Sequence, residues 1–167
     1  RNPALKKYIG KTLKEVSEIR GTSPQVTAMS LVAEDNSRVD AVFFLMSEEN
    51  VIKQMKKPWI SFGSDAGALA NEGVFIEKST HPRAYGNFAR VLGKYSRDEK
   101  IISLTEAIRR MTSLPAKNIG VYDRGLLEID NYADIIIFDP KTIKDMATFE
   151  KPHAYAIGMK HVFVNGT

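Results

Sequence analysis

The sequence predicts an α/β fold, and three observations predict it. Helix-capping patterns recur through residues 1–115, two short apolar segments separate the helices there, and residues 116–167 hold short apolar runs between turn residues. Strands that alternate with helices are typical of a parallel sheet, whereas short strands joined by turns favour an antiparallel one. The sequence therefore predicts a first part with a parallel sheet, residues 1–115, and a second part that is an antiparallel β element, residues 116–167.

Two helices are expected near the start of the chain. Thr12 and Glu15 have the spacing of a capping box, and Gly21 is a typical residue at which such a helix ends. Ser23 and Pro24 then supply an N-cap and a first helical residue for a second helix. Each helix has apolar residues at helical spacing, so each is expected to bury one face.

Two buried strands are expected next, with a helix between them. Residues 39–46, VDAVFFLM, form a nearly continuous apolar run, which is typical of a strand covered on both faces. Ser47 caps the following helix and Pro58 ends it, and residues 59–62, WISF, form the second strand. Parallel strands joined by a helix end at the same edge of the sheet, which is where ligands bind.

An unusually long loop, residues 66–80, precedes the remaining helices. A helix with its apolar face between Phe88 and Tyr95 follows the loop, and Ser103 with Glu106 begins another. Long ordered loops after barrel strands more often shape a site than merely connect two elements. The short strands expected beyond residue 115 are residues 133–138, 154–159 and 161–164.

The composition excludes several classes of protein. The chain has 167 residues, 43% of them hydrophobic and 26% charged, which is typical of a globular domain. Its net charge of +4 is scattered rather than clustered, which is evidence against a nucleic-acid surface. It has no cysteine, so disulfides and thiolate metal sites are excluded, and a cytoplasmic location is favoured. No apolar run approaches the ~20 residues of a membrane span, so no membrane partner is expected. Because the chain begins at Arg1 rather than Met, we expect it to be a piece of a longer protein.

Asp65 lies just after the second expected strand, within PWISFGSDAG at residues 58–67. One interpretation is structural, because Gly, Ser and Asp are ordinary turn residues. The other is catalytic, because barrels of alternating strands and helices carry their catalytic groups at the carboxyl ends of the strands. The local sequence leaves both interpretations open.

Several motifs together resemble one family. The segment MTSLPAKNIGVYDRGLLEIDNYADIIIFDP, followed later by VFVNG, resembles the C-terminal signature of the amidohydrolase superfamily. More narrowly, four motifs are similar, in the same order, to the D-aminoacylase group, the N-acyl-D-amino-acid deacylases: MSEENV, GSDAGA, HPRAYGNFARVLGKY and RGLLEIDNYADIIIFDP. The resemblance extends over nearly the whole chain. It implies the C-terminal part of a metal-dependent (β/α)8 barrel for residues 1–115, and strands of a small β-sandwich for residues 116–167.

The resemblance also implies roles for three residues. Asp65 would lie beside a zinc ion, as a possible metal ligand, and would take a proton from water and pass it to the leaving amine. Arg83 would bind the substrate, since its planar fork matches a carboxylate, although it could equally tie the long loop to the barrel. His81 would contact substrate or metal, or act as a capping or supporting residue, which is an ordinary role for a lone His before Pro.

The histidine content departs from the family pattern. Members of the superfamily carry a His-x-His pair and further His ligands, whereas this sequence has only His81, His153 and His161. Zinc is therefore expected to be bound mostly by residues outside this chain. A lesser departure is Asp130–Asn131, where many relatives have Gly; both residues tolerate left-handed conformations, so the turn can survive.

The expected function is that of a zinc-dependent hydrolase that cleaves the amide bond of small N-acyl-D-amino acids to a carboxylate and a free D-amino acid. One alternative is a hydrolase of cyclic amides, related to dihydropyrimidinase or dihydroorotase. The other is an autonomous domain without catalysis. We expect the chain alone to be inactive, and to self-associate if its open strand edges lack partners.

Overall fold

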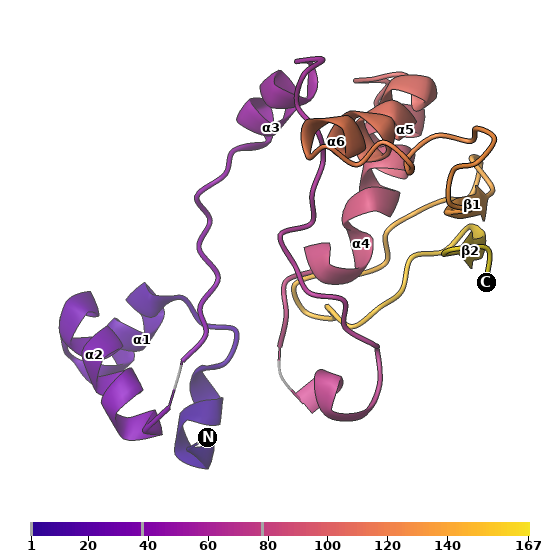
Figure 1. The fold of residues 1–167 in the computed structure, drawn as a ribbon. Coiled ribbons are helices and arrows are strands. Elements are labelled where there is room, and N and C mark those ends of the chain that lie inside the picture. The colour runs from indigo at the N-terminus through magenta and orange to yellow at the C-terminus, as the bar shows by residue number, and fades with distance from the viewer. Residues whose placement is uncertain (1, 38, 78) are drawn as a thin grey trace. The chain divides into compact units, whose positions relative to one another are not determined.

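The computed structural model describes residues 2–37, 39–77 and 79–167. The chain divides into two compact units, Arg1–Phe44 and Leu45–Thr167. Figure 1 traces both, with the first in indigo and violet and the second running from violet to yellow. The predicted division at residue 115 is a different one, and it stays a prediction.

The first unit is helical. Its elements are η1 (Pro3–Tyr8, a 3-10 helix), α1 (Leu13–Arg20) and α2 (Pro24–Asp35). The capping box that begins α1 is complete, since Thr12 N–H donates to Glu15 Oε2 over 2.6 Å and Glu15 N–H donates to Thr12 Oγ1 over 3.2 Å. Ser23 caps α2. Both predicted helices are confirmed.

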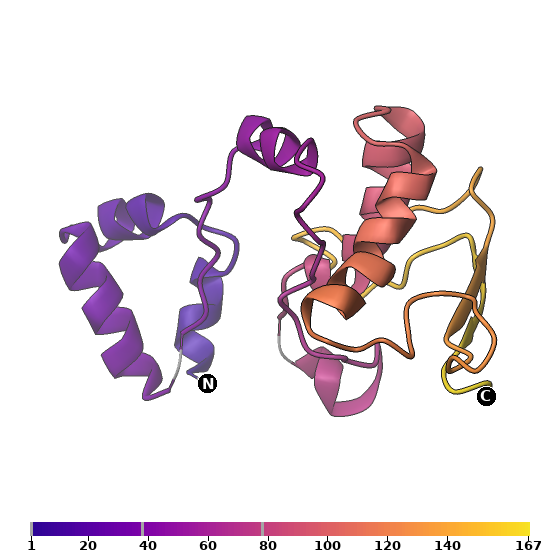
Figure 2. The same ribbon diagram turned by 45° about the horizontal axis from the view of Figure 1, so that its top comes forward.

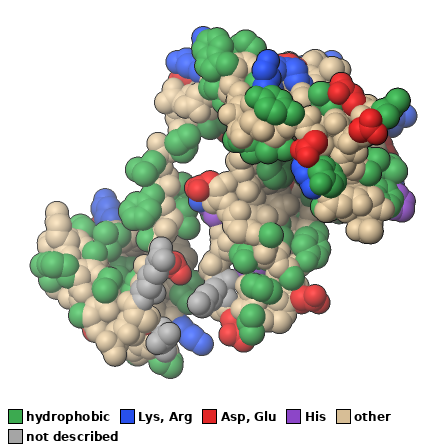
Figure 3. Space-filling view, in the orientation of Figure 1, with side chains coloured by type: hydrophobic (Ala, Val, Ile, Leu, Met, Phe, Trp, Pro, Cys, Tyr) green, Lys and Arg blue, Asp and Glu red, His purple; other side chains and the backbone are tan. Residues whose placement is uncertain are grey.

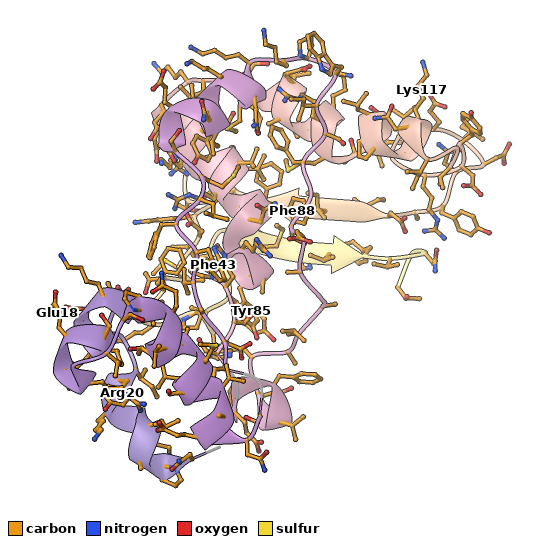
Figure 4. The ribbon with its side chains drawn as sticks, turned by 90° about the vertical axis from the view of Figure 1, so that its left-hand side faces the viewer. Glu18, Arg20, Phe43, Tyr85, Phe88 and Lys117 are labelled. Carbon is orange, nitrogen blue, oxygen red and sulfur yellow. The ribbon has the colours of Figure 1, made fainter. Side chains whose placement is uncertain are left out.

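Arg20 ties the helices of the first unit together. Its guanidinium donates to both carboxylate oxygens of Glu34 on α2, over 2.6 and 2.9 Å, and lies 4.9 Å from the ring centre of Tyr8. A bidentate pair of this kind fixes orientation as well as distance. Figures 2 and 4 show α1 and α2 side by side, and Arg20 is labelled in Figure 4.

The second unit has a helical core. Its helical elements are α3 (Glu48–Met55), η2 (Gly73–Glu77, 3-10), α4 (Arg83–Arg90), η3 (Val91–Asp98, a π-helix that continues α4), α5 (Leu104–Met111) and α6 (Ser113–Asn118). The caps predicted at Ser47 and Ser103 are confirmed. Leu92 and Tyr95 of η3 pack with Ala107 of α5, and Ile143, only 1% exposed, joins them from the C-terminal segment. The last part of the chain therefore completes a core that the helices begin.

Two strands pair in the described part of the chain. β1 (Ile135–Phe138) and β2 (Met159–Phe163) run antiparallel, with Ile135 opposite Phe163, and the register shifts between Ile137 and Phe138. The predicted antiparallel β element is thus confirmed for these strands.

The prediction of strands at residues 39–46 and 59–62 is wrong for this structure. The first segment is extended but pairs with no strand among the described residues, and Phe43 on it is 75% exposed. The second bonds to a helix instead, since Phe62 N–H donates to the Arg110 carbonyl of α5 over 3.1 Å. A strand exists only where a neighbour takes up its backbone groups, and the described residues supply no neighbouring strand to either segment. The predicted barrel stays a prediction.

Many apolar side chains of the described residues lie at the surface. On the β pair and its flanks they include Ile136, Val162 and Val164, each about half exposed. Hydrophobic side chains appear across the face drawn in Figure 3. No helix in the described ranges is long and apolar enough to cross a membrane.

Candidate active site

Asp65 and Arg83 meet at the start of α4. Arg83 Nη2 lies 2.8 Å from Asp65 Oδ2, and the Asp65 side chain is 89% exposed. Asp65 has a left-handed backbone (φ 48°), a conformation that Asp adopts more readily than most residues. The turn interpretation and the catalytic one are therefore compatible, because the same turn brings the carboxylate to the surface beside a guanidinium.

His81 binds the first backbone N–H of the helix that carries Arg83. Its Nδ1 accepts the backbone N–H of Arg83 over 3.1 Å, which satisfies a donor at the start of α4 that has no partner within the helix. The His81 ring lies edge-on to Phe149 at 5.0 Å. Desolvation lowers the pKa of His81, and the Arg83 charge lowers it further. His81 is thus a neutral acceptor near pH 7 that positions Arg83.

Asn87 holds the other side of the Asp65 turn. Its Nδ2 donates to the carbonyl of Gly63 over 3.2 Å. Asn87 follows Arg83 by four residues, so both side chains leave the same face of α4. Sequence reasoning missed Asn87; its i, i+4 spacing from Arg83 is the signal that could have revealed it.

Arg110 supports the segment that leads to Asp65. It is 1% exposed, and its guanidinium donates to the carbonyls of Ile60, over 2.6 Å, and Met55, while lying 4.6 Å from the ring centre of Phe62. Its Nη2 has no hydrogen-bond partner among the described residues. Sequence reasoning missed Arg110 as well, although it lies on the buried face of α5, one turn after Ala107, where a charge is unusual.

These residues form an accessible pair of opposite charges on a supported turn. A carboxylate can accept and return a proton, and a guanidinium can bind a second carboxylate. The described residues contain no group of three or more His, Cys, Asp or Glu that could hold a metal ion. The predicted residues Asp65, His81 and Arg83 thus come together, whereas His161 lies on β2, with its ring against Phe163.

The sequence pattern of the Amidohydrolase family matches residues 19–167. The chain belongs to the amidohydrolase family. Two relatives from Alcaligenes xylosoxydans xylosoxydans support a narrower likeness: the chain is 36% identical to a D-aminoacylase and 34% identical to an N-acyl-D-glutamate deacylase, each over 157 residues and 94% of the chain. The expected resemblance to the D-aminoacylase group is confirmed.

Solved structures agree with the sequence relatives. This amidohydrolase chain matches an N-acyl-D-glutamate deacylase from Bordetella bronchiseptica, complexed with zinc and a phosphonate inhibitor, with a TM-score of 0.80 and 33% identity over 94% of the chain. It matches a crystal structure of D-aminoacylase with the same TM-score and 35% identity over 98% of the chain. A further D-aminoacylase match was studied for its binuclear metal centre.

The chain spans about 30% of the length of the curated relatives it matches and 31 to 32% of these structures.

Proposed function

We propose that the protein containing this chain hydrolyses the amide bond of N-acyl-D-amino acids. The observation that carries the proposal is the exposed pair of Asp65 and Arg83, held by His81 and Asn87 at the start of α4. Relatives named D-aminoacylase, N-acyl-D-glutamate deacylase and N-acyl-D-aspartate deacylase support this substrate class.

Asp65 is the proposed acid–base residue. Its carboxylate takes a proton from the water that attacks the amide carbon and returns it to the nitrogen as the C–N bond breaks. An amine leaves poorly unless it is protonated, so one carboxylate serves both steps. The high exposure of Asp65 supports this role, because substrate and water can both reach its oxygens.

Arg83 is the proposed substrate-binding residue. Its fork of donors matches the α-carboxylate of an N-acyl amino acid, which can be bound bidentately. The contact with Asp65 uses Nη2, and the guanidinium has further donors for a second carboxylate. In the absence of substrate, the contact of Arg83 with Asp65 joins the two ends of the long loop. The alternative role of Arg83, tying the loop to the barrel, stays a prediction.

Zinc fits this chain only in part. Asp65 would be the residue of this chain that holds it, and the described ranges hold no cluster of three ligands, so the remaining ligands would come from elsewhere in the protein. The zinc in the Bordetella bronchiseptica deacylase supports this cofactor. A bound zinc ion supplies a Lewis acid that polarises the carbonyl and acidifies water.

The test uses the protein expressed from its complete reading frame. Hydrolysis of N-acetyl-D-methionine and N-acetyl-L-methionine is measured with zinc present, in the unsubstituted protein and in Asp65→Asn. Asn tolerates the left-handed backbone, so the variant changes the chemistry and leaves the turn. We expect D-selective hydrolysis that falls by about 10²- to 10⁴-fold in the variant.

Two results would contradict the proposal. Activity that survives in Asp65→Asn would leave Asp65 as a turn residue. Inactivity toward both enantiomers would favour the alternatives, either a hydrolase of cyclic amides or a domain without catalysis. Cytoplasmic location and self-association of the isolated chain stay predictions.

A further inference from the structure

The segment between Asp65 and Arg83 forms a loop with closed ends. The 2.8 Å ion pair joins the residues that flank it, and η2 (Gly73–Glu77) lies within it. Surface loops whose ends lie close together are frequently functional, and their own packing holds them in place.

Two tyrosine hydroxyls hold one peptide unit of this loop. Tyr85 Oη donates to the carbonyl of Ala70 over 3.0 Å, and the backbone N–H of Asn71 donates to Tyr155 Oη over 2.8 Å. The carbonyl of Ala70 and the N–H of Asn71 belong to the same peptide bond. Both polar groups of that peptide are thus bound by side chains, as a fixed loop requires.

The two tyrosines also contact each other. Their ring centres lie 5.7 Å apart at an interplanar angle of 72°, which is the favoured edge-to-face geometry. His153 packs on Tyr85 from the same C-terminal segment, at 5.9 Å and 64°. Tyr85 extends from α4, where Figure 4 labels it, so α4 and the C-terminal segment both contact the loop. We call Tyr85 and Tyr155 with the Ala70–Asn71 peptide the clamp.

The loop beyond the clamped peptide presents apolar side chains. Val74, Phe75 and Ile76 of η2 are 70%, 44% and 51% exposed. The ends of the loop carry the charged pair Asp65 and Arg83. The loop thus carries both a charged pair and exposed apolar side chains, the two kinds of contact that a ligand with a carboxylate and an apolar group would need.

We propose that Tyr85 and Tyr155 are positioning residues that set the affinity of the site for N-acyl-D-amino acids with a large apolar group. This inference rests on the proposed function. The clamp orders the loop before substrate binds, which reduces the entropy lost on binding. Both hydroxyls are engaged by the loop peptide rather than by Asp65 or Arg83, so we expect their loss to change KM rather than the chemical step.

The test replaces each tyrosine by phenylalanine in the full-length enzyme, singly and together. Phe keeps the ring contact and removes only the hydroxyl. A neutral hydrogen bond contributes enough to change KM for N-acetyl-D-leucine by about 2- to 10-fold, and we expect kcat to change by less than about twofold. Because the two hydroxyls hold one peptide, we expect the double variant to raise KM by less than the product of the single effects.

The matched control is Tyr122→Phe, since Tyr122 is 79% exposed and lies outside the loop. It should leave KM unchanged. The second readout is amide hydrogen exchange at Asn71, which we expect to quicken in Tyr155→Phe and to stay constant in the control.

Two results would overturn the inference. Unchanged exchange at Asn71 in Tyr155→Phe would show that the clamp does not hold the loop. Faster exchange with an unchanged KM would show that the loop does not set affinity. Failure of the proposed function appears separately, as inactivity of the unsubstituted enzyme toward N-acyl-D-amino acids, and the exchange measurement would still decide whether the clamp exists.

Discussion

The guanidinium of Arg83 lies 2.8 Å from the carboxylate of Asp65, and this contact closes the loop between them. The Asp65 side chain is 89% exposed and the Arg83 side chain 43%. Exposed ion pairs contribute little to stability, because water solvates the separated charges well. A substrate carboxylate can therefore bind Arg83 at little cost to the fold.

Arg83→Ala should raise KM for an N-acyl-D-amino acid by about tenfold or more and lower kcat less, because it removes the charged hydrogen bonds that we propose Arg83 makes to the substrate. Arg83→Lys should have an intermediate KM, since it keeps the charge and loses the fork. Arg90→Ala is the matched control: Arg90 lies at the other end of α4 and pairs with Asp145 over 2.8 Å. Steady-state kinetics of the three variants test whether Arg83 binds the substrate. An unchanged KM in Arg83→Ala would remove Arg83 from the substrate site.

His81 should make stability depend on pH. Its pKa is lowered in the folded chain, chiefly by desolvation and also by Arg83, so the unfolded chain binds the proton more tightly. The stability linked to His81 is therefore present above the unfolded pKa of about 6.5 and is lost as pH falls through the lower, folded pKa. Protonation of Nδ1 also removes the acceptor for the Arg83 N–H.

The comparison is with His81→Asn, which offers an acceptor to the same N–H but does not titrate. Urea unfolding at a series of pH values should show a smaller loss of stability below pH 6.5 in the variant. Parallel pH profiles for the two proteins would contradict the assignment.

Helices of this chain could be predicted from sequence because their signals are local. Thr12 with Glu15, Ser47 and Ser103 each bond to backbone within a few residues, and the structure confirms all of these caps. Strands depend on distant partners. The run around Phe43 has the composition of a buried strand, but the described chain supplies no strand to pair with it. Composition predicts that a segment suits a strand, and only a neighbour makes it one.

The residues of the candidate site also divide into those that the sequence predicts and those that it does not. Asp65, His81 and Arg83 belong to two motifs, and the structure brings them together at one end of α4. Tyr155 and Arg110 act on backbone far along the chain, on the Asn71 N–H and the Ile60 carbonyl. Their partners are fixed by packing of the second unit, and no sequence spacing encodes them.

Arg110→Met should destabilise the second unit by about 2–3 kcal/mol, because the carbonyls of Ile60 and Met55 lose charged donors inside the fold. The segment before Asp65 would also lose its support, so kcat should fall as well. Arg97→Met is the control, since Arg97 donates to the Pro140 and Ile143 carbonyls, away from Asp65.

Thermal unfolding and kinetics are measured on both variants. We expect both substitutions to lower Tm and only Arg110→Met to lower kcat. If Arg110→Met and Arg97→Met have the same kcat, Arg110 contributes to stability alone.

Gly158 should be intolerant of any side chain. It lies just before β2 with φ +85°, and a Cβ there would come within 2.5 Å of the Cα and backbone N of Ile143. Because Ile143 is a core residue with 1% exposure, it cannot move aside cheaply. Gly166 supplies the matched control, since its φ of +81° is nearly the same and its Cβ would meet only Ala133, at an ordinary 3.7 Å.

Gly166→Ala should therefore cost only the backbone strain of a left-handed alanine, about 1–2 kcal/mol. Gly158→Ala should cost that strain and also the displacement of Ile143, so its Tm should fall further. The difference between the two Tm values measures how tightly the C-terminal segment packs on the helical core. Equal Tm values would show that the segment can move away from Gly158 freely, and that Ile143 is not fixed by the core around Leu92.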